Sequence, residues 1–487
     1  MQDIAKSFAM AFFASTLLGV HPIPVEIEID LSSGLPFFQI VGLPDAILRE
    51  SKTRVKSAIL QAGYEFPYDQ RVVLNLAPSK VKKEGSGFEL GLAARILASS
   101  GQIPAPDFNV LFLGELALDG GIRSIPEIEA LSFAAAHSFS KGIKFDLIVA
   151  NVDNLQGISH LGIPLLGVKH LNDFKGERWW DKAVAPLKEV KPNKPIDGPQ
   201  FKDLKFTEFW AKHLVIAAFG GHHYFLCGPP GCGKTFFAES LKLLLNSLEE
   251  KPSIERRLLN AVFQRGSNDF PWAAPHHSAS MHGILGGGNP PRAGAITRAH
   301  GGILFLDELL EFTPACLDSL REPVEKGAVE IFRAGNYTVF PSRFQIVGAT
   351  NPCRCGYWKS RYKECTCQPT HRKNYQARLS GPFFDRFDVK LHCRRAERGE
   401  KTIEGSEILS QLKDLKKERL LVPTWSKAAL LKFEERATKR HFNFRTIEKT
   451  KRLAVTLAQI EGLSAVGIRN VAEACELQSF KDLESLI

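Results

Sequence analysis

Two short stretches of the chain carry residue types that bind and cleave a nucleotide. The first is Gly228-Pro-Pro-Gly-Cys-Gly-Lys234-Thr235, which follows an apolar run that predicts a strand and precedes a pattern that predicts a helix. Glycines let successive backbone N–H groups point at a di- or triphosphate, the lysine places a charge on the outer phosphates, and the threonine hydroxyl suits a magnesium ion. A chance glycine turn would not need the flanking strand and helix. The predicted nucleotide ligands are Gly228, Pro229, Pro230, Gly231, Cys232, Gly233, Lys234 and Thr235.

The second stretch, Gly302-Ile-Leu-Phe-Leu-Asp307-Glu308, is a continuous apolar run that ends in two carboxylates. Such a run predicts a strand that is buried on both faces. Asp307 is expected to hold magnesium together with Thr235, and Glu308 to polarise the water that attacks the γ-phosphate. A solvated acidic turn would explain either carboxylate alone, but not the pair downstream of a phosphate loop. The sequence therefore predicts a magnesium-dependent ATPase.

Four cysteines form a third candidate site, as Cys353-x-Cys355 and, after a short loop, Cys365-x-Cys367. Two close pairs suit one tetrahedral zinc ion that fixes the loop. The one-residue spacer is tighter than the usual C-x-x-C, so unligated or redox-active thiols are the alternative. His371 could replace one ligand.

Length and composition describe a large globular protein. The 487 residues suggest two or three domains, and the net charge of +10 permits an acidic partner such as nucleic acid without requiring one. The apolar stretch after Lys6 is too short to span a bilayer and lacks a convincing cleavage site. Nine unevenly spaced cysteines fit a reducing compartment. We expect a cytoplasmic protein with no membrane partner.

The patterns divide the chain into four segments. Residues 1–175 alternate short strand and helix patterns, residues 176–202 are a proline-rich linker, residues 203–395 form the nucleotide domain, and residues 396–487 are helical. Within the first segment we expect a helix from Asp45 to Ala62, a strand from Arg71 to Leu76 and a helix from Pro126 to Ser138. Within the nucleotide domain, an insertion around 270–299 has a core, Gly286 to Pro291, that predicts a mobile loop. A β-hairpin is expected across Gly335-Asn336. The many lysines and arginines of residues 412–452 favour either a solvated helix face or a surface that follows phosphates.

With these pieces in order, the sequence resembles the ComM/YifB family of magnesium-chelatase-like AAA+ ATPases over nearly its whole length. The motifs that carry the resemblance, besides the phosphate loop, are Leu35-Pro-x-x-x-Ile-Val-Gly-Leu-Pro44, Asn75-Leu-Ala-Pro78 with Lys83-Glu-Gly85, Ala274-Pro-His-His277, Phe305-Leu-Asp-Glu308, Leu320-Arg-Glu-Pro-Val-Glu325, Asn351-Pro-Cys-x-Cys-Gly356 and Ser380-Gly-Pro-x-x-Asp-Arg-Phe-Asp388.

The resemblance implies an α/β multidomain protein with an α+β Lon-protease-like (S5-type) N-terminal domain, an AAA+ core with a chelatase-type insertion, and a C-terminal helical lid. It also implies a homo-hexameric ring and ATP-driven branch migration or helicase action on single-stranded or branched DNA during natural transformation, with other recombination proteins as candidate partners. The alternative is a chelatase-type subunit that uses ATP to help insert magnesium into a tetrapyrrole.

The resemblance also gives roles to three further residues. Asn351 resembles the sensor that orients the attacking water, and Arg386 resembles an arginine finger supplied to a neighbouring subunit. Arg445 resembles the lid arginine that contacts the γ-phosphate. Arg378 is the alternative finger. Each arginine has a competing interpretation as a surface ion-pair residue.

Proteolysis is the activity of Lon-type domains, in which a lysine activates a serine. Here the register places Gly87 at the nucleophile position, with Ser86 one residue early. The lysine's segment carries Arg123, whose guanidinium does not deprotonate to serve as a base. We therefore expect a non-catalytic N-terminal domain, and a protease is the third and least favoured function.

Overall fold

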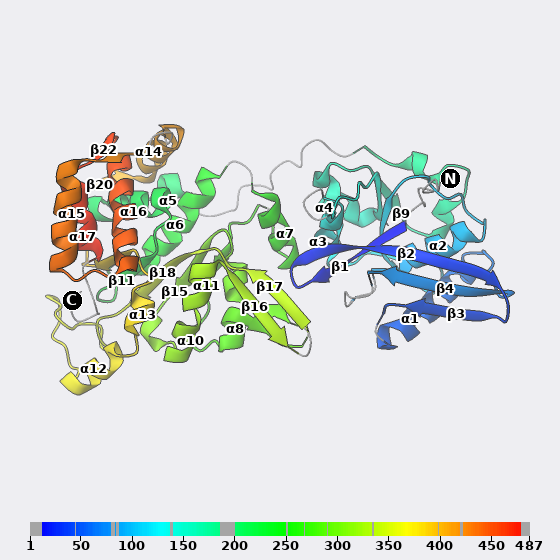
Figure 1. Cartoon of the computed structure of the whole chain (residues 1–487), viewed down its shortest axis with the longest axis horizontal. Helices are drawn as coiled ribbons and strands as arrows, with labels where there is room; N and C mark the ends of the chain where they lie inside the picture. The colour runs from blue at the N-terminus through cyan, green and yellow to red at the C-terminus, as the bar shows by residue number, and fades with distance from the viewer. Residues whose placement is uncertain are drawn as a thin grey trace, which may run out of the picture. The chain divides into compact units, whose positions relative to one another are not determined.

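The chain forms two compact units in a computed structural model (Figure 1). The first contains residues up to 194 and the segment 257–267, and the second contains residues 195–256 and 268–487. The structure describes residues 12–43, 45–78, 83, 87–136, 140–185, 200–249, 252–266, 268–289, 291–333, 336–397, 399–418 and 422–478.

The first unit is built on a seven-stranded mixed sheet in the order β3-β4-β2-β1-β5-β8-β9. Strands β1, β2 and β4 are antiparallel neighbours, and the outer pairs are parallel. The strands are β1 Phe12–Leu18, β2 His21–Ser33, β3 Phe37–Val41, β4 Gln70–Ala77, β5 Val110–Leu113, β8 Leu147–Asn151 and β9 Leu165–Val168, with a small pair β6 Glu115–Leu116 and β7 Ile122–Arg123. The described part of the apolar stretch after Lys6 is thus strand β1.

Helices α1 (Asp45–Gln61) and α2 (Glu89–Ser99) contribute apolar side chains to the main core of this unit. The shorter helices are α3 Ile128–Ser132 and α4 Leu155–Ile158. Trp179 is completely buried in the same core, and its Nε1 donates a hydrogen bond to the Pro104 carbonyl at 3.0 Å. The first unit therefore continues beyond residue 175, where we expected it to end. Residues 186–199 of the expected linker lie outside the described residues.

A helix from the middle of the chain also belongs partly to the first unit. Helix α7 spans Ile254–Val262, and its residues from 257 onward group with this unit. Leu258 and Ala261 pack against Ala130 and Phe133 in a small separate core. This segment lies between the phosphate loop and Asp307 in the sequence, before residues 270–299, where we predicted the insertion.

The second unit contains a five-stranded sheet in the order β12-β15-β18-β11-β19, in which all neighbours are parallel. The strands are β12 Trp272–Ala273, β15 Ile303–Leu306, β18 Gln345–Thr350, β11 Tyr224–Cys227 and β19 Val389–His392. The central strands are fully buried, as continuous apolar runs require in a parallel sheet. The parallel α/β sheet is that of the predicted P-loop core. The loops after β11, β18 and β15 meet at one edge, because carboxyl ends of parallel strands share an edge.

The helices that pack on this sheet come from the start of the second unit and from its C-terminal segment. They include α5 (Glu208–Gly220) and α6 (Lys234–Leu248), whose apolar faces form one core with the C-terminal helices. The C-terminal segment is helical, as predicted, with α14 Gly405–Glu418, α15 Lys427–Lys439, α16 Phe444–Ile460 and α17 Ile468–Gln478 (Figure 1). Its action as a lid stays a prediction. In the described chain, no helix has the length and apolar character that crossing a bilayer demands.

The insertion and the predicted hairpin are short ordered elements. Gly286–Gly287 (β13) pairs with Arg292–Ala293 (β14), so only the turn between them is the loop we expected, and Pro290 lies outside the described residues. The predicted hairpin is present as β16 Ala328–Arg333 and β17 Asn336–Pro341. The remaining elements are α8 Met281–Leu285, α9 Ala295–Arg298, α10 Pro314–Ser319, α11 Arg321–Lys326, α12 Pro369–Gln376, α13 Gly381–Phe384 and the small strand pairs β10 Lys205–Thr207 with β20 Thr402–Glu404 and β21 Thr424–Trp425 with β22 Ala465–Val466.

Candidate active site

The phosphate loop joins the end of β11 to the start of α6, as the sequence predicts. Gly231 and Gly233 have φ of +74° and +95°, a conformation that side chains disfavour. Gly228 is required for a different reason, since a Cβ there would lie 2.4 Å from the Cys393 carbonyl oxygen. The glycines therefore fix a tight loop in front of a helix N-terminus, which is where phosphates bind.

Lys234 links this loop to the neighbouring strand. Its Nζ donates hydrogen bonds to the carbonyls of Gly228 at 2.8 Å and Pro229 at 3.1 Å, and to Asn351 Oδ1 at 3.2 Å. Asn351 directly follows β18, which pairs with β11. The structure thus brings together the predicted lysine and the predicted sensor.

Thr235 and Asp307 are also adjacent. The Thr235 hydroxyl donates to Asp307 Oδ2 at 3.2 Å, and Asp307 Oδ1 accepts a hydrogen bond from the Glu308 backbone N–H at 2.9 Å. A hydroxyl and a carboxylate side by side are hard oxygen donors, which magnesium prefers. These residues therefore fit the predicted magnesium site.

Glu308 has a partner that the sequence analysis did not assign. Its Oε2 lies 3.4 Å from His277 Nδ1, and its φ of +50° is uncommon for a residue with a side chain. His277 belongs to the motif Ala274-Pro-His-His277, which we used only to identify the family. The histidine orients the carboxylate predicted to polarise water.

Arg395 holds the phosphate loop from the other side. Its Nε and Nη2 donate to the Pro230 carbonyl at 3.0 and 2.8 Å. Gly356, in the four-cysteine loop, packs against the same proline, because a Cβ there would lie 2.6 Å from Pro230 Cδ. No motif in the sequence indicated either contact. The phosphate loop is therefore braced by two segments that follow β18 and β19.

Cys232, within the phosphate loop, lies in an unusual electrostatic environment. A hydrogen bond with Cys393 lowers the pKa of the Cys232 thiol to about 6, with burial opposing the shift and the charge of Lys234 assisting it. Burial raises the pKa of Cys393. Both Cys393 and Lys234 thus favour the ionised form of the Cys232 thiol.

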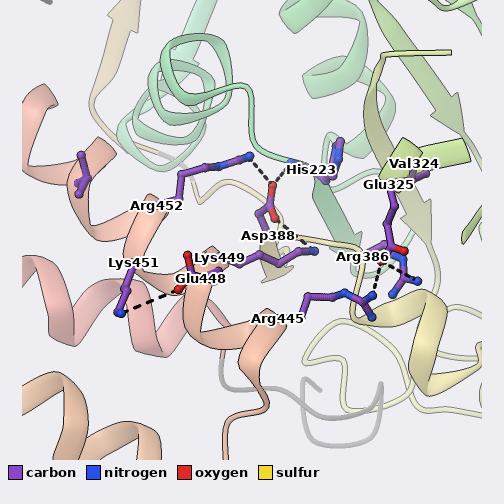
Figure 2. Close-up of a pocket in the computed structure, with 11 residues that line it drawn as sticks. His223, Val324, Glu325, Arg386, Asp388, Arg445, Glu448, Lys449, Lys451 and Arg452 are labelled. Atoms are coloured by element: carbon purple, nitrogen blue, oxygen red, sulfur yellow. Dashed lines mark hydrogen bonds and ion pairs between the residues drawn. The ribbon is translucent and has the colours of Figure 1, made fainter. Parts of the chain in front are cut away.

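Arg386 and Arg445 meet at a cavity of about 620 Å³ (Figure 2). Arg386 Nη2 lies 2.9 Å from Glu325 Oε1, and Arg445 forms an ion pair with the same oxygen. The Arg386 side chain is 5% exposed, whereas the Arg445 side chain is 46% exposed. The lining contains no phosphate-loop residue and consists of His223, Val324, Glu325, Arg386, Asp388, Arg445, Glu448, Lys449, Lys451, Arg452 and Val455. The structure brings the two arginines together, at a site separate from Lys234.

Asp388 anchors the basic side of this cavity. It lies 2.8 Å from Arg452 and 3.3 Å from Lys449 and accepts the His223 backbone N–H at 2.9 Å. Burial favours its protonation, but a hydrogen bond with His222 and the charges of His223, Lys449 and Arg452 hold the pKa of Asp388 well below its ordinary value. This carboxylate fixes helix α16, and with it Arg445, against the core.

Arg378 occupies a different place from Arg386. Its Nη1 donates to the Leu310 carbonyl at 3.1 Å and lies 3.4 Å from Glu311. These residues closely follow Glu308 in the same chain. Arg378 therefore supports the segment after the acidic pair. This contact accounts for an arginine at this position without any role in a neighbouring subunit.

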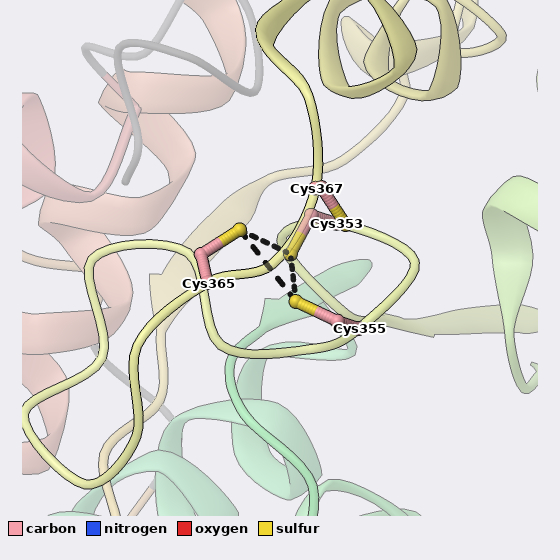
Figure 3. Close-up of side chains that lie close together, drawn as sticks. All are labelled: Cys353, Cys355, Cys365 and Cys367. Atoms are coloured by element: carbon pink, nitrogen blue, oxygen red, sulfur yellow. Dashed lines mark hydrogen bonds between the residues drawn. The ribbon is translucent and has the colours of Figure 1, made fainter.

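The four cysteines converge at the start of the loop after Asn351 (Figure 3). Their sulfurs all lie within 4.8 Å of one another, and Cys355 Sγ is 3.4 Å from Cys353 Sγ and 3.5 Å from Cys365 Sγ. Four thiols at this spacing fit one tetrahedral zinc ion. Within the described chain, the cluster comprises the four cysteines without His371.

The residues at the nucleophile and lysine positions of a Lon-type protease lie just before α2 and in β7. Ser86 lies outside the described residues. Gly87 is buried against Ile125, since a Cβ there would lie 3.2 Å from the Ile125 Cδ1 atom, and Arg123 lies 3.9 Å from Glu115. The non-catalytic, Lon-like character of this unit stays a prediction.

Comparisons with known proteins identify the family of this chain. A family model described as magnesium chelatase, subunit ChlI, matches residues 200–401, and a second, described as subunit ChlI of Mg-chelatase, matches residues 27–150. The chain is 38% identical over 384 residues to the uncharacterized protein YifB of Salmonella typhimurium, covering 77% of this chain and 74% of YifB.

Two further relatives carry names that describe a process or an activity. The chain is 35% identical over 431 residues to competence protein ComM of Haemophilus influenzae, covering 84% of this chain and 82% of ComM. It is 26% identical over 348 residues to a rice (Oryza sativa subsp. japonica) protein named Probable DNA helicase MCM9, covering 68% of this chain and 45% of that protein. From the ComM and YifB matches, this chain belongs to the ComM/YifB family of magnesium-chelatase-like AAA+ ATPases.

Proposed function

We propose that this protein is an ATP-hydrolysing, hexameric ring motor that moves DNA strands, as in branch migration. The observation that carries the ATPase is the meeting of Lys234, Thr235, Asp307 and Asn351 at the carboxyl edge of one parallel sheet. The four residues come from three separate motifs, and their contacts match the roles that nucleotide hydrolysis needs.

Each of these residues has a separate role in the proposed reaction. The phosphate loop and Lys234 bind the phosphates of ATP. Thr235 and Asp307 would hold magnesium, which would neutralise charge on the phosphate oxygens. Glu308, oriented by His277 at 3.4 Å, takes the proton of the attacking water. Asn351 positions that water. Because the Lys234 amine touches Asn351, movement at the phosphates reaches the sensor directly.

The hexamer is supported by the arginine pair at Glu325. Arg386 and Arg445 hold one carboxylate, away from the phosphate loop of their own chain. In the proposed ring, the two cations face the γ-phosphate in the neighbouring subunit, where Arg386 acts as the finger. Glu325 would release both side chains when the phosphate competes for them.

Action on DNA is supported by the names of relatives, a competence protein and a DNA helicase. A second candidate follows from the names of both family models, since a chelatase subunit would use the same ATPase core to help insert magnesium into a tetrapyrrole. The two functions differ in what the ATPase acts on, so substrate assays separate them.

A strand-exchange assay tests the motor. A labelled three-stranded DNA with a movable branch point should be resolved by the wild-type protein with ATP and magnesium, whereas Glu308→Gln should bind the DNA without resolving it. Failure of the wild-type protein to move the branch, under conditions in which it hydrolyses ATP, would contradict the motor.

A further inference from the structure

The loop after Asn351 concentrates positive charge. Residues 354–373 contain six basic side chains and one acidic side chain, a net charge of +5, against +10 for all 487 residues. A zinc ion on four thiolates would lower the net charge of this segment by two and leave it positive. The basic residues are Arg354, Lys359, Arg361, Lys363, Arg372 and Lys373.

These cations are not used in internal ion pairs. None of the six forms an ion pair with a carboxylate in the described part of the chain, and all are exposed except Arg372, which is half-buried. The basic C-terminal helices, for which a phosphate-following surface was one of two interpretations, differ in this respect. There, Arg436 and Arg440 donate to the backbone carbonyls of Ala472 and Cys475, and other cations bind Asp388. Part of that basic surface is therefore structural.

Aromatic rings alternate with the cations on the loop. Lys363 lies over the Tyr357 ring at 5.3 Å, Arg372 over Trp358 at 4.6 Å, and Arg395 over Tyr362 at 5.0 Å. The Tyr362 side chain is 50% exposed. Bases stack on aromatic rings and on guanidinium planes, while lysine and arginine follow the phosphates between them.

We propose that residues 354–373, the aromatic-basic loop, bind single-stranded nucleic acid. Tyr362 supplies the stacking surface, and Lys359, Arg361 and Lys363 contact phosphates. A duplex satisfies only the phosphate contacts, because its bases are already stacked on one another. This inference rests on the proposed action on DNA and names the surface that performs it.

The aromatic-basic loop is also attached to the nucleotide site. It leaves β18 directly after Asn351, Gly356 packs on Pro230, and Tyr362 contacts Arg395, which binds the Pro230 carbonyl. A nucleic-acid strand bound to the aromatic-basic loop would therefore be separated from the phosphate loop by a single residue, Gly356 or Arg395. We expect DNA binding here to change the rate of ATP hydrolysis.

The test measures binding of a fluorescent oligothymidylate to the full-length protein. Tyr362→Ala should weaken binding by about 5- to 150-fold, the range for losing one stacked base. Arg361→Ala with Lys363→Ala should reduce the slope of log affinity against log salt by about 1.4, two phosphate contacts at about 0.7 each. Binding to duplex DNA should respond to the second change and much less to Tyr362→Ala.

A matched control exists in the first unit, where Lys56 lies 4.7 Å over Tyr68, which is 49% exposed. Lys56→Ala with Tyr68→Ala should leave oligothymidylate binding unchanged.

Zinc content of each variant reports whether the aromatic-basic loop stays folded, and Tyr362→Phe should restore binding. If the wild type binds DNA and all loop variants bind equally well, the inference is wrong and the proposed function stands. If the wild type binds no DNA, both fail.

Discussion

Lys234 Nζ donates a hydrogen bond to Asn351 Oδ1 at 3.2 Å, which joins the phosphate loop to the strand next to it. The two residues are 117 positions apart in the sequence, and the pairing of β11 with β18 brings them together. We therefore expect Lys234 and Asn351 to respond to the same phosphate when ATP is bound.

Lys234 and Glu308 should fail in different ways. Lys234→Ala should weaken ATP binding by about 10- to 150-fold, the loss of a charged hydrogen-bond donor. Glu308→Gln should keep binding and lower turnover by about 100- to 10,000-fold, because the amide does not accept the proton of water. Fluorescent-nucleotide titration and phosphate release measure the two effects.

Glu239 provides the control for the second change, since it is an exposed carboxylate on helix α6. Glu239→Gln should behave as wild type. An equal loss of ATP affinity in the Lys234 and Glu308 variants would refute the division of roles.

Arg386 should act on the neighbouring subunit. Arg386→Ala should lower turnover by about 1,000-fold or more in a uniform ring. Mixing it with Glu308→Gln should restore activity, because about a quarter of the interfaces then combine an intact site with an intact arginine. Phosphate release from mixed and unmixed samples measures the recovery.

Arg378→Ala distinguishes the two arginines. When Arg378→Ala subunits are mixed with Glu308→Gln subunits, ATP turnover should not exceed that of the Arg378→Ala subunits themselves. Arg378 binds Leu310 in its own chain, so a neighbouring subunit does not replace it. Recovery with Arg378→Ala and none with Arg386→Ala would move the finger to Arg378.

The four-cysteine cluster should bind one zinc ion per chain. Cys365→Ser should lose most of the zinc, since one of four thiolate ligands is removed. His371→Ala should keep it, because His371 is not part of the cluster. Elemental analysis of the purified proteins decides the question. A wild type with far less than one zinc per chain, unaffected by Cys365→Ser, removes the site.

The stability of the second unit should fall in mild acid. Burial, with the charge of Lys212, lowers the pKa of His213 to about 3. An unfolded histidine has a pKa near 6.5, so between about pH 6.5 and 3 the unfolded chain binds a proton that the folded chain does not. The resulting stability is present above pH 6.5 and is lost as the pH falls. From pH 7.5 to 5.0 the loss is about 2 kcal/mol.

His213→Gln removes the titrating group, so its free energy of unfolding should depend on pH by about 2 kcal/mol less than that of the wild type over the same interval. Urea unfolding at both pH values provides the comparison, and the exposed His371→Gln is the control. Identical pH dependence in His213→Gln and the wild type would show that His213 is not responsible.

Local patterns predicted much of the fold. The helix expected from Asp45 to Ala62 spans Asp45–Gln61, and the strand expected from Arg71 to Leu76 spans Gln70–Ala77. Apolar periodicity and flanking glycines determine such elements locally. The helix expected from Pro126 to Ser138 is shorter, since α3 ends at Ser132 and a 3₁₀ turn follows.

Contacts between residues that are far apart in the sequence could not be predicted from local patterns. The phosphate loop and Asp307 were predicted because their spacing alone specifies their chemistry. Arg395, His277 and Glu325 were missed as site residues, because each acts through a partner far away in the sequence. Only the packing of the strands and helices brings these partners together.

Stimulation of ATP hydrolysis by DNA tests the central claim most directly. Phosphate release by the wild-type protein should rise with single-stranded or branched DNA at low salt and fall back as salt increases, because phosphate contacts release counterions. Glu308→Gln should give no signal with any DNA. A wild-type ATPase that ignores single-stranded, branched and duplex DNA alike, yet responds to a porphyrin or to chelatase partner subunits, would contradict the DNA motor and support the tetrapyrrole function.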